Sequence, residues 1–276
     1  MTWGSRKLRW CVALFISIFL LSGCDRRNSE KSDKFNSALE KFKAHCLSSG
    51  IRINRRVENV DGFYLLKLRP ENINFDDQFL LDDPYGRDLT GEDYIASLLR
   101  GQFWHSHVVT RQTAPDYRIG YKFLDAVDPK DGVRYRYTGK VVAVRQQDLS
   151  SPMVKLAIER DKNYDTNIYE FKVFKVPAPQ ELPLYGLTFD DISTSEDRKN
   201  WIAGSSLRVI DISTGAVMAE RIGFMFDHRQ GDRSVGRSPW LFAADNACPK
   251  FIGKPGFIAQ PYQTLDLVQQ VLSPST

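Results

Sequence analysis

The residues best suited to hold a metal ion are two histidines, His105 and His107, which are separated by one serine. On a β-strand, residues i and i+2 point to the same face, so both imidazole rings could bind one cation. Two ligands do not complete a site, and a third would have to come from elsewhere, such as His228 or a carboxylate. The alternative is a half-exposed strand beside Phe103 and Trp104 that binds no metal.

Acidic residues gather between positions 82 and 93, and calcium favours oxygen-rich loops of this kind. The cluster consists of Asp82, Asp83, Asp88, Glu92 and Asp93. Its spacing does not match an EF-hand, and a turn followed by a helix start accounts for part of it. The chain also lacks the short motifs of a serine nucleophile, a phosphate loop, a zinc protease or a dinucleotide site. We therefore expect no cofactor and no catalysis, with an envelope hydrolase or metal-dependent enzyme using His105 and His107 as the alternative.

Two groups of basic residues are candidates for contact with a partner. The first lies on one face of a predicted strand and consists of Arg134, Arg136 and Lys140. Such a ladder could meet an acidic protein surface or anionic lipid headgroups. The second lies in a polar loop and consists of Arg229 and Arg233. The alternative for the ladder is a solvated face whose arginine stems cover apolar neighbours.

The amino-terminal segment has the pattern of a secretory signal. Three basic residues precede an apolar run of twelve residues, Trp10 to Leu21. As a helix, twelve residues span roughly 18 Å, which is short of the ~30 Å hydrocarbon core of a bilayer. A membrane-spanning helix is therefore the less favoured interpretation.

The end of this run, Leu21-Ser22-Gly23-Cys24, resembles the lipobox of bacterial lipoproteins. The resemblance implies that a signal peptide, residues 1–23, is cleaved and that Cys24 becomes the acylated first residue, carrying chains such as palmitate. Several acyl chains give a stable membrane anchor. Asp25 resembles the signal that retains enterobacterial lipoproteins in the inner membrane. We therefore expect a lipid-anchored protein of the cell membrane that faces the periplasm.

Charge and composition argue against a nucleic-acid partner. The whole chain has 38 Lys and Arg against 34 Asp and Glu. Three of the basic residues lie in the signal, so the mature chain has 35 against 34, a formal charge of +1. A nucleic-acid-binding surface requires a strong basic excess, which this chain does not have.

The mature chain would retain two cysteines besides Cys24, namely Cys46 and Cys248. An even number of cysteines in an oxidising compartment favours a disulfide between them. The alternative is a pair of buried free thiols. The bond would fasten an amphipathic helix, whose apolar stripe includes Phe35, Leu39 and Phe42, to the carboxyl-terminal part of the fold.

The remaining pattern predicts an α+β fold with mainly antiparallel β hairpins, an N-terminal helix, a short middle helix after Thr90 and a C-terminal helix over Tyr262 to Leu272. Turn signals place hairpins around Asp61-Gly62, 128–132 and 213–215. Residues 24–33 are expected to be a tether and 34–276 a globular region. This region could form two interlocked halves, 34–176 and 186–276, around the proline-rich segment 177–185.

Taken together, these features favour non-catalytic protein binding at the membrane. The segments GFYLLKLRPENINFDDQFLLDDPYGRD and ADNACP resemble uncharacterised proteobacterial lipoproteins, some of which are candidate immunity proteins against secreted lipase effectors of type VI systems. The resemblance implies a toxin or effector as the partner and carries no residue roles. A structural component of an envelope complex is the other non-enzymatic alternative.

Overall fold

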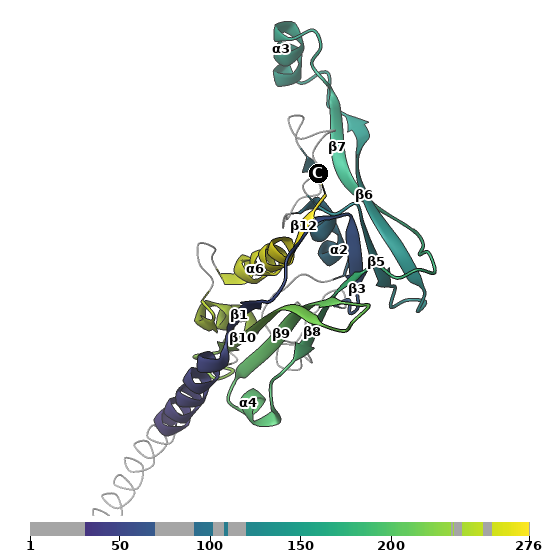
Figure 1. Ribbon diagram of the computed structural model, residues 1–276. Coiled ribbons are helices and arrows are strands. Elements are labelled where there is room, and N and C mark those ends of the chain that lie inside the picture. Colours follow the sequence, from purple (N-terminus) through teal and green to yellow (C-terminus); the bar gives the residue numbers. More distant parts are fainter. Residues whose placement is uncertain are drawn as a thin grey trace, which may run out of the picture.

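The computed structural model describes residues 31–69, 91–101, 108–109, 120–232, 234, 239–250 and 256–275. It confirms the α+β fold, since one large sheet of mainly antiparallel strands carries a helix near the start, the middle and the end of the described chain (Figure 1). The predicted signal, Cys24 and Asp25 lie outside the described residues. None of the helices in the described ranges is both long and apolar enough to cross a bilayer.

The described chain forms a main sheet, a small two-stranded sheet and several helices. The strands of the main sheet are β1 (Gly50–Ile53), β3 (Gly62–Leu65), β4 (Val108–Val109), β5 (Phe123–Val127), β6 (Arg134–Gln146), β7 (Asn167–Pro177), β8 (Tyr185–Asp191), β9 (Ile202–Asp211), β10 (Val217–Phe226) and β11 (Ala247–Cys248). A two-stranded sheet is formed by β2 (Val57–Val60) and β12 (Leu272–Pro274). The helices are an N-terminal helix over residues 31–48, α2 (Gly91–Arg100), α3 (Pro152–Arg160), α4 (Ser195–Lys199), α5 (Pro239–Ala243), the 3₁₀ turn η2 (Ala244–Asn246) and α6 (Gly256–Val271).

The order of strands in the main sheet is β1-β10-β9-β8-β3-β5-β6-β7-β4, with β11 added to β10. Strands from before and after the proline-rich segment 177–185 therefore lie in one sheet, where β1 pairs with β10 and β3 pairs with β8. The last three residues of the predicted tether, 31–33, are helical.

Two of the three predicted hairpins are confirmed. β5 pairs with β6 across the turn at 128–133, where the carbonyl of Asp128 accepts from the amide of Gly132 at 2.8 Å. β9 pairs with β10 across a turn in which the Asp211 carboxylate accepts from the amide of Ser213 and Gly215 has a φ of +72°. In the first turn the Asp128 carboxylate also accepts from the amide of Lys130, and Gly132 has a φ of +71°. Both turns are therefore closed by an aspartate acceptor and a left-handed glycine.

The predicted hairpin around Asp61-Gly62 is wrong. β3 lies between β5 and β8 and runs parallel to both, whereas β2 pairs with β12. A Cβ atom at Gly62 would lie 2.2 Å from the carbonyl oxygen of Phe123, so the glycine serves the close approach of β3 to β5. Asp-Gly is a strong local signal for a turn, but here the long-range strand pairing decides the backbone conformation.

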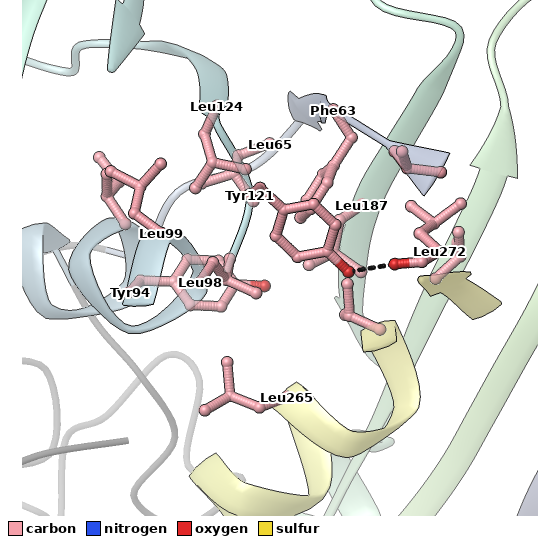
Figure 2. Packing of buried hydrophobic residues seen from close by; sticks show 14 of the residues in the cluster. Phe63, Leu65, Tyr94, Leu98, Leu99, Tyr121, Leu124, Leu187, Leu265 and Leu272 are labelled. Carbon is pink, nitrogen blue, oxygen red and sulfur yellow. Dashed lines mark hydrogen bonds between the residues drawn. The ribbon is translucent and has the colours of Figure 1, made fainter. Parts of the chain in front are cut away.

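The main core lies between the sheet and the helices α2 and α6 (Figure 2). α2 contributes Tyr94 and Leu98, α6 contributes Leu265, and the sheet contributes residues such as Phe63 and Leu124. These side chains have almost no solvent exposure, and each one stabilises the fold by roughly 1.5–3 kcal/mol through burial.

A buried hydrogen bond joins the end of the chain to the residues before β5. The hydroxyl of Tyr121 donates to the carbonyl of Leu272 at 2.5 Å, and both residues are buried. Burial raises the pKa of Tyr121 far above its usual range, so the phenol stays protonated and keeps donating. The bond ties the strand that follows α6 to the residues that lead into β5.

The N-terminal helix is amphipathic as predicted and packs on the end of β9 and β10. Phe42 stacks on Phe226 with ring centroids 5.4 Å apart, and Phe35 lies 5.8 Å from the same ring. His45 stacks on Phe224 at 4.4 Å. The helix is therefore fixed to the body rather than joined to it by a flexible connection.

A buried carboxylate holds the helix in place on its polar side. Asp197 of α4 accepts hydrogen bonds from His45 at 2.8 Å and from Thr194 at 2.7 Å, and it lies 3.2 Å from Lys41. Burial raises the pKa of this carboxyl, but the hydrogen bonds outweigh that effect and hold it at about 2. Asp197 thus remains charged at any pH near neutrality and keeps its contacts to the helix.

The two cysteines of the predicted disulfide lie at bonding distance, with their Sγ atoms 2.12 Å apart and their Cα atoms 5.5 Å apart. Cys46 belongs to the N-terminal helix, and Cys248 belongs to β11 at the edge of β10. The two residues are separated by 202 positions in sequence.

Candidate protein-binding surface

A long two-stranded arm leaves the body of the protein (Figure 1). β5 pairs with β6 only over Arg134–Tyr137, whereas β6 and β7 remain paired as far as Gln146 and Asn167. Nine residues of α3 stand at the end of this ribbon. We refer to β6, α3 and β7 together with the turns between them as the arm. β6 and β7 are rich in β-branched and aromatic residues, which favour long strands.

The inner face of the arm belongs to the core. Tyr137 of β6 and Phe171 of β7 are buried, and the guanidinium of Arg100 on α2 lies 5.3 Å from the Phe171 ring. A Cβ atom at Gly139 would lie 2.1 Å from the Phe171 ring, so only glycine leaves room for this packing. The inner face is thus structural, and the opposite face is the one available for contact.

The predicted ladder lies on that opposite face, because Arg134, Arg136 and Lys140 alternate with the inward-facing tyrosines of β6. The structure gives Arg136 an intramolecular partner. Its guanidinium donates to both oxygens of Asp125 on β5, at 2.7 and 3.1 Å, and lies 3.8 Å from the Phe123 ring. The Asp125 side chain is fully buried, so this pair is part of the sheet structure.

Arg134 also has partners within the chain. Its guanidinium donates to the carbonyls of Pro179 and Gln180 and lies 5.8 Å from the Tyr64 ring. It therefore fixes the segment that connects β7 to β8. Lys140 is the member of the ladder that is exposed, and no ion pair to it is found among the described residues.

Exposed apolar residues accompany Lys140 on this face. On β7, Phe174 is 47% and Val176 is 56% exposed, and both alternate with the inward-facing residues. Lys172 lies directly opposite Lys140 and contacts Glu170 at 2.9 Å. We call Lys140, Lys172, Phe174 and Val176 the outer face of the arm. An exposed aromatic residue with an apolar neighbour is suited to binding a protein surface, and the lysines beside them would lie at the polar rim of such a contact.

Sequence reasoning missed the apolar part of this face. In β7 the run Lys172 to Val176 alternates lysines and apolar residues irregularly, so either parity could face the core. Phe171 is buried and therefore points to the core. Successive residues of a strand point to opposite faces, so Phe174, three positions later, points outward. The burial of Phe171 depends on α2, which lies far away in sequence.

A groove lies beside the outer face of the arm. It has a volume of about 600 Å³ and is lined by β2, the start of β3 and residues of the proline-rich segment, including Leu182 and Leu184. Arg136 and Phe123 also line it. The predicted ladder thus reaches a concave surface through Arg136, which the sequence pattern did not indicate.

The other predicted site residues either lie outside the described residues or lie away from the arm. His105, His107 and Arg233 lie outside the described residues. His228 is exposed and meets the edge of Phe226, with ring centroids 5.1 Å apart. Arg229 follows β10, which is separated from β6 by the strands β9, β8, β3 and β5. Within the described ranges no three His, Cys, Asp or Glu side chains are grouped so that they could hold a metal.

Searches with the chain against protein-family models, curated proteins and solved structures find no match in any of the three.

Proposed function

We propose that this chain is a lipid-anchored periplasmic protein that acts by binding another protein. The observation that carries the proposal is the arm, which presents an outer face with exposed Phe174, Val176 and Lys140 at a distance from the N-terminal helix (Figure 1). Exposed aromatic and apolar residues favour a protein partner, because aromatic side chains are enriched in protein interfaces and lysines are typical of the polar rim around them.

The proposed anchor is compatible with this geometry. The predicted acylation site, Cys24, precedes the described helix at residue 31 by seven positions. That helix is fixed to the sheet by its aromatic contacts and by Asp197. An anchor at Cys24 would therefore restrain the orientation of the body and leave the arm to extend from the membrane.

Acylation at Cys24 is tested by changing this residue alone. A Cys24→Ser chain is expected to take up no radiolabelled palmitate and to be lost from the membrane fraction, because the acyl chains supply the membrane affinity. Cys11→Ser is the matched control and should keep both the label and the location, since Cys11 precedes the predicted cleavage site. Wild-type protein that incorporates no palmitate, or that retains Met1, would contradict the proposed anchor.

Protein binding is tested by capture from membranes with the full lipidated chain. The double substitution Phe174→Asp and Val176→Asp is expected to reduce recovery of the partner by about tenfold, because two central apolar contacts are replaced by charges. Lys43→Glu changes an exposed residue of the N-terminal helix and should leave recovery unchanged. Equal recovery by both variants, or no stoichiometric partner for the wild type, would contradict the proposal.

The finer form of the proposal names the partner as a secreted antibacterial lipase effector. It is supported by the resemblance of GFYLLKLRPENINFDDQFLLDDPYGRD to candidate immunity lipoproteins and by the proposed place beside the lipids that such an effector attacks. In this form the captured protein is a lipase, and the purified chain abolishes its hydrolysis of phospholipid. A captured protein of another class would contradict the finer form and leave the coarser one standing.

A further inference from the structure

The end of the arm is a closed and hydrogen-bonded unit, which we call the tip and which comprises residues 147–166 with α3. The amide of Gln147 donates to the carbonyl of Thr166 at 2.8 Å and closes the base of the tip. The hydroxyl of Tyr164 donates to the side chain of Gln147 at 3.3 Å, and Val154 of α3 is buried. The tip is therefore ordered before any partner arrives, which lowers the entropic cost of binding.

Three apolar side chains of the tip face solvent. Met153 is 75%, Leu149 is 47% and Leu156 is 40% exposed. Met153 and Leu156 are three residues apart on α3, so they are neighbours on the helix surface, on the side away from the buried Val154. Single exposed apolar residues are ordinary, but a group of three at the end of a projecting arm is typical of an interaction site.

Three of the four carboxylates of the tip are used by its own turns, and the fourth, Glu159 on α3, is exposed. The Asp148 carboxylate accepts from the amide and hydroxyl of Ser150, and Asp161 accepts from the amide of Asn163. Asp165 accepts from the side chain of Asn167 and from the hydroxyl of Tyr169. The hydrogen bonds of these three aspartates therefore stabilise the tip itself.

The cations of the tip are not used in this way. Lys155, Arg160 and Lys162 are exposed, and within the described part of the chain none of them forms an ion pair. Arg160 lies four residues after Leu156 and is therefore its neighbour on the helix surface. A partner that covers Met153 and Leu156 would meet this guanidinium at the edge of the contact. The complement of such a patch is an apolar pocket with acidic residues at its rim.

The position of the tip decides between a protein and the membrane as the surface it meets. In Figure 1, α3 stands at one end of the molecule and the N-terminal helix leaves at the other. A chain anchored through residues that precede this helix holds the tip away from its own bilayer. A folded protein in the space beyond the membrane is therefore the partner that the geometry favours.

We propose that the tip docks into an apolar, acid-rimmed pocket of a folded partner protein, with Met153 and Leu156 inserted in the pocket and Arg160 at its rim. This inference rests on the proposed function and deepens it, because it names a second contact, at the tip, and the chemistry of the partner. A standard interface covers about 800 Å² per partner, so the proposed contact includes the outer face of the arm as well as the tip. A methionine suits the central position because its side chain adapts to irregular pockets.

The test uses the full lipidated chain in detergent micelles and the partner captured by the wild type. Met153→Asp combined with Leu156→Asp is expected to weaken the affinity by at least about tenfold, because two carboxylates would enter an apolar pocket with an acidic rim. Arg160→Glu is expected to weaken it about threefold to tenfold, mainly through a slower association rate that depends less on salt. Leu47→Asp, at a position that is 90% exposed on the N-terminal helix, is the matched control and should change nothing.

The outcomes separate this inference from the function on which it rests. If the tip double variant binds within twofold of the wild type while Phe174→Asp with Val176→Asp binds weakly, the protein-binding function stands and the role of the tip is overturned. If the wild type captures no partner, both are overturned. Non-acylated Cys24→Ser chain is also mixed with vesicles of phosphatidylethanolamine and phosphatidylglycerol. Sedimentation with these vesicles that is lost in the tip double variant would identify a lipid surface and overturn the protein partner.

Discussion

Removal of the bond between Cys46 and Cys248 is expected to lower the free energy of unfolding by up to about 5 kcal/mol on the chain-entropy description. The two residues are 202 positions apart, so the bond closes a loop of most of the described chain. Without the bond, the unfolded chain has a higher conformational entropy, and the folded state is therefore less stable relative to it. The measurement is denaturant unfolding of the wild type and of a Cys46→Ala, Cys248→Ala double variant.

The expected effect has a local part as well. Cys46 and Cys248 pack beside Phe42, Phe224 and Phe226, which hold the N-terminal helix on the sheet. The double variant should therefore exchange the amides of this helix faster than those of the central strands. A reducing agent should bring the wild type to the stability of the double variant and leave the variant unchanged. Full reaction of both wild-type thiols with maleimide after non-reducing denaturation would contradict the bond.

The parts of the fold that the sequence predicts correctly are those decided by neighbours along the chain. The turn at 213–215 has an aspartate acceptor and a glycine within five residues of each other, and the hairpin around it is present. The stripe of Phe35, Leu39 and Phe42 has the helical period, and the helix is present. Local chemistry is sufficient in both cases, because the partners of each backbone group are close in sequence.

The predictions that fail, or that no pattern suggests, depend on long-range pairing. Gly62 lies in a turn motif, yet its backbone is set by the approach of β3 to Phe123. The C-terminal helix extends over Gly256–Val271 and so includes Pro261, before which the pattern predicts no helix. A proline inside a helix removes one backbone hydrogen bond, so the local pattern begins the helix only after Pro261.

The candidate site shows the same division. Alternation along β6 places Arg134, Arg136 and Lys140 on one face, and the structure has them so. Which of them are available to a partner depends on Asp125 and on the carbonyl of Pro179, and neither contact has a signature in the sequence. The exposure of Phe174 likewise follows from the burial of Phe171 beside α2. Composition and spacing thus predict the kind of surface, and tertiary contacts decide which of its residues are exposed.

Replacing Arg136 by alanine is expected to destabilise the fold by about 3–5 kcal/mol, because it leaves the fully buried Asp125 carboxylate without its charged partner. Two hydrogen bonds of 2.7 and 3.1 Å and the stacking on Phe123 are lost together. Asp125 and Arg136 are directly opposite in the β5–β6 pair, so no other cation can take the vacated place without moving the strands. The measurement is the midpoint of urea unfolding at neutral pH.

Two further variants separate the loss of the ion pair from a general effect of losing an arginine. Arg145→Ala removes the same side chain from an exposed position of the same strand and should change stability by less than about 0.5 kcal/mol. The double change Asp125→Leu with Arg136→Met should recover most of the loss, since an apolar pair of similar volume avoids the uncompensated buried charge. A fall in stability for Arg145→Ala as large as that for Arg136→Ala would show that the buried carboxylate is not the cause.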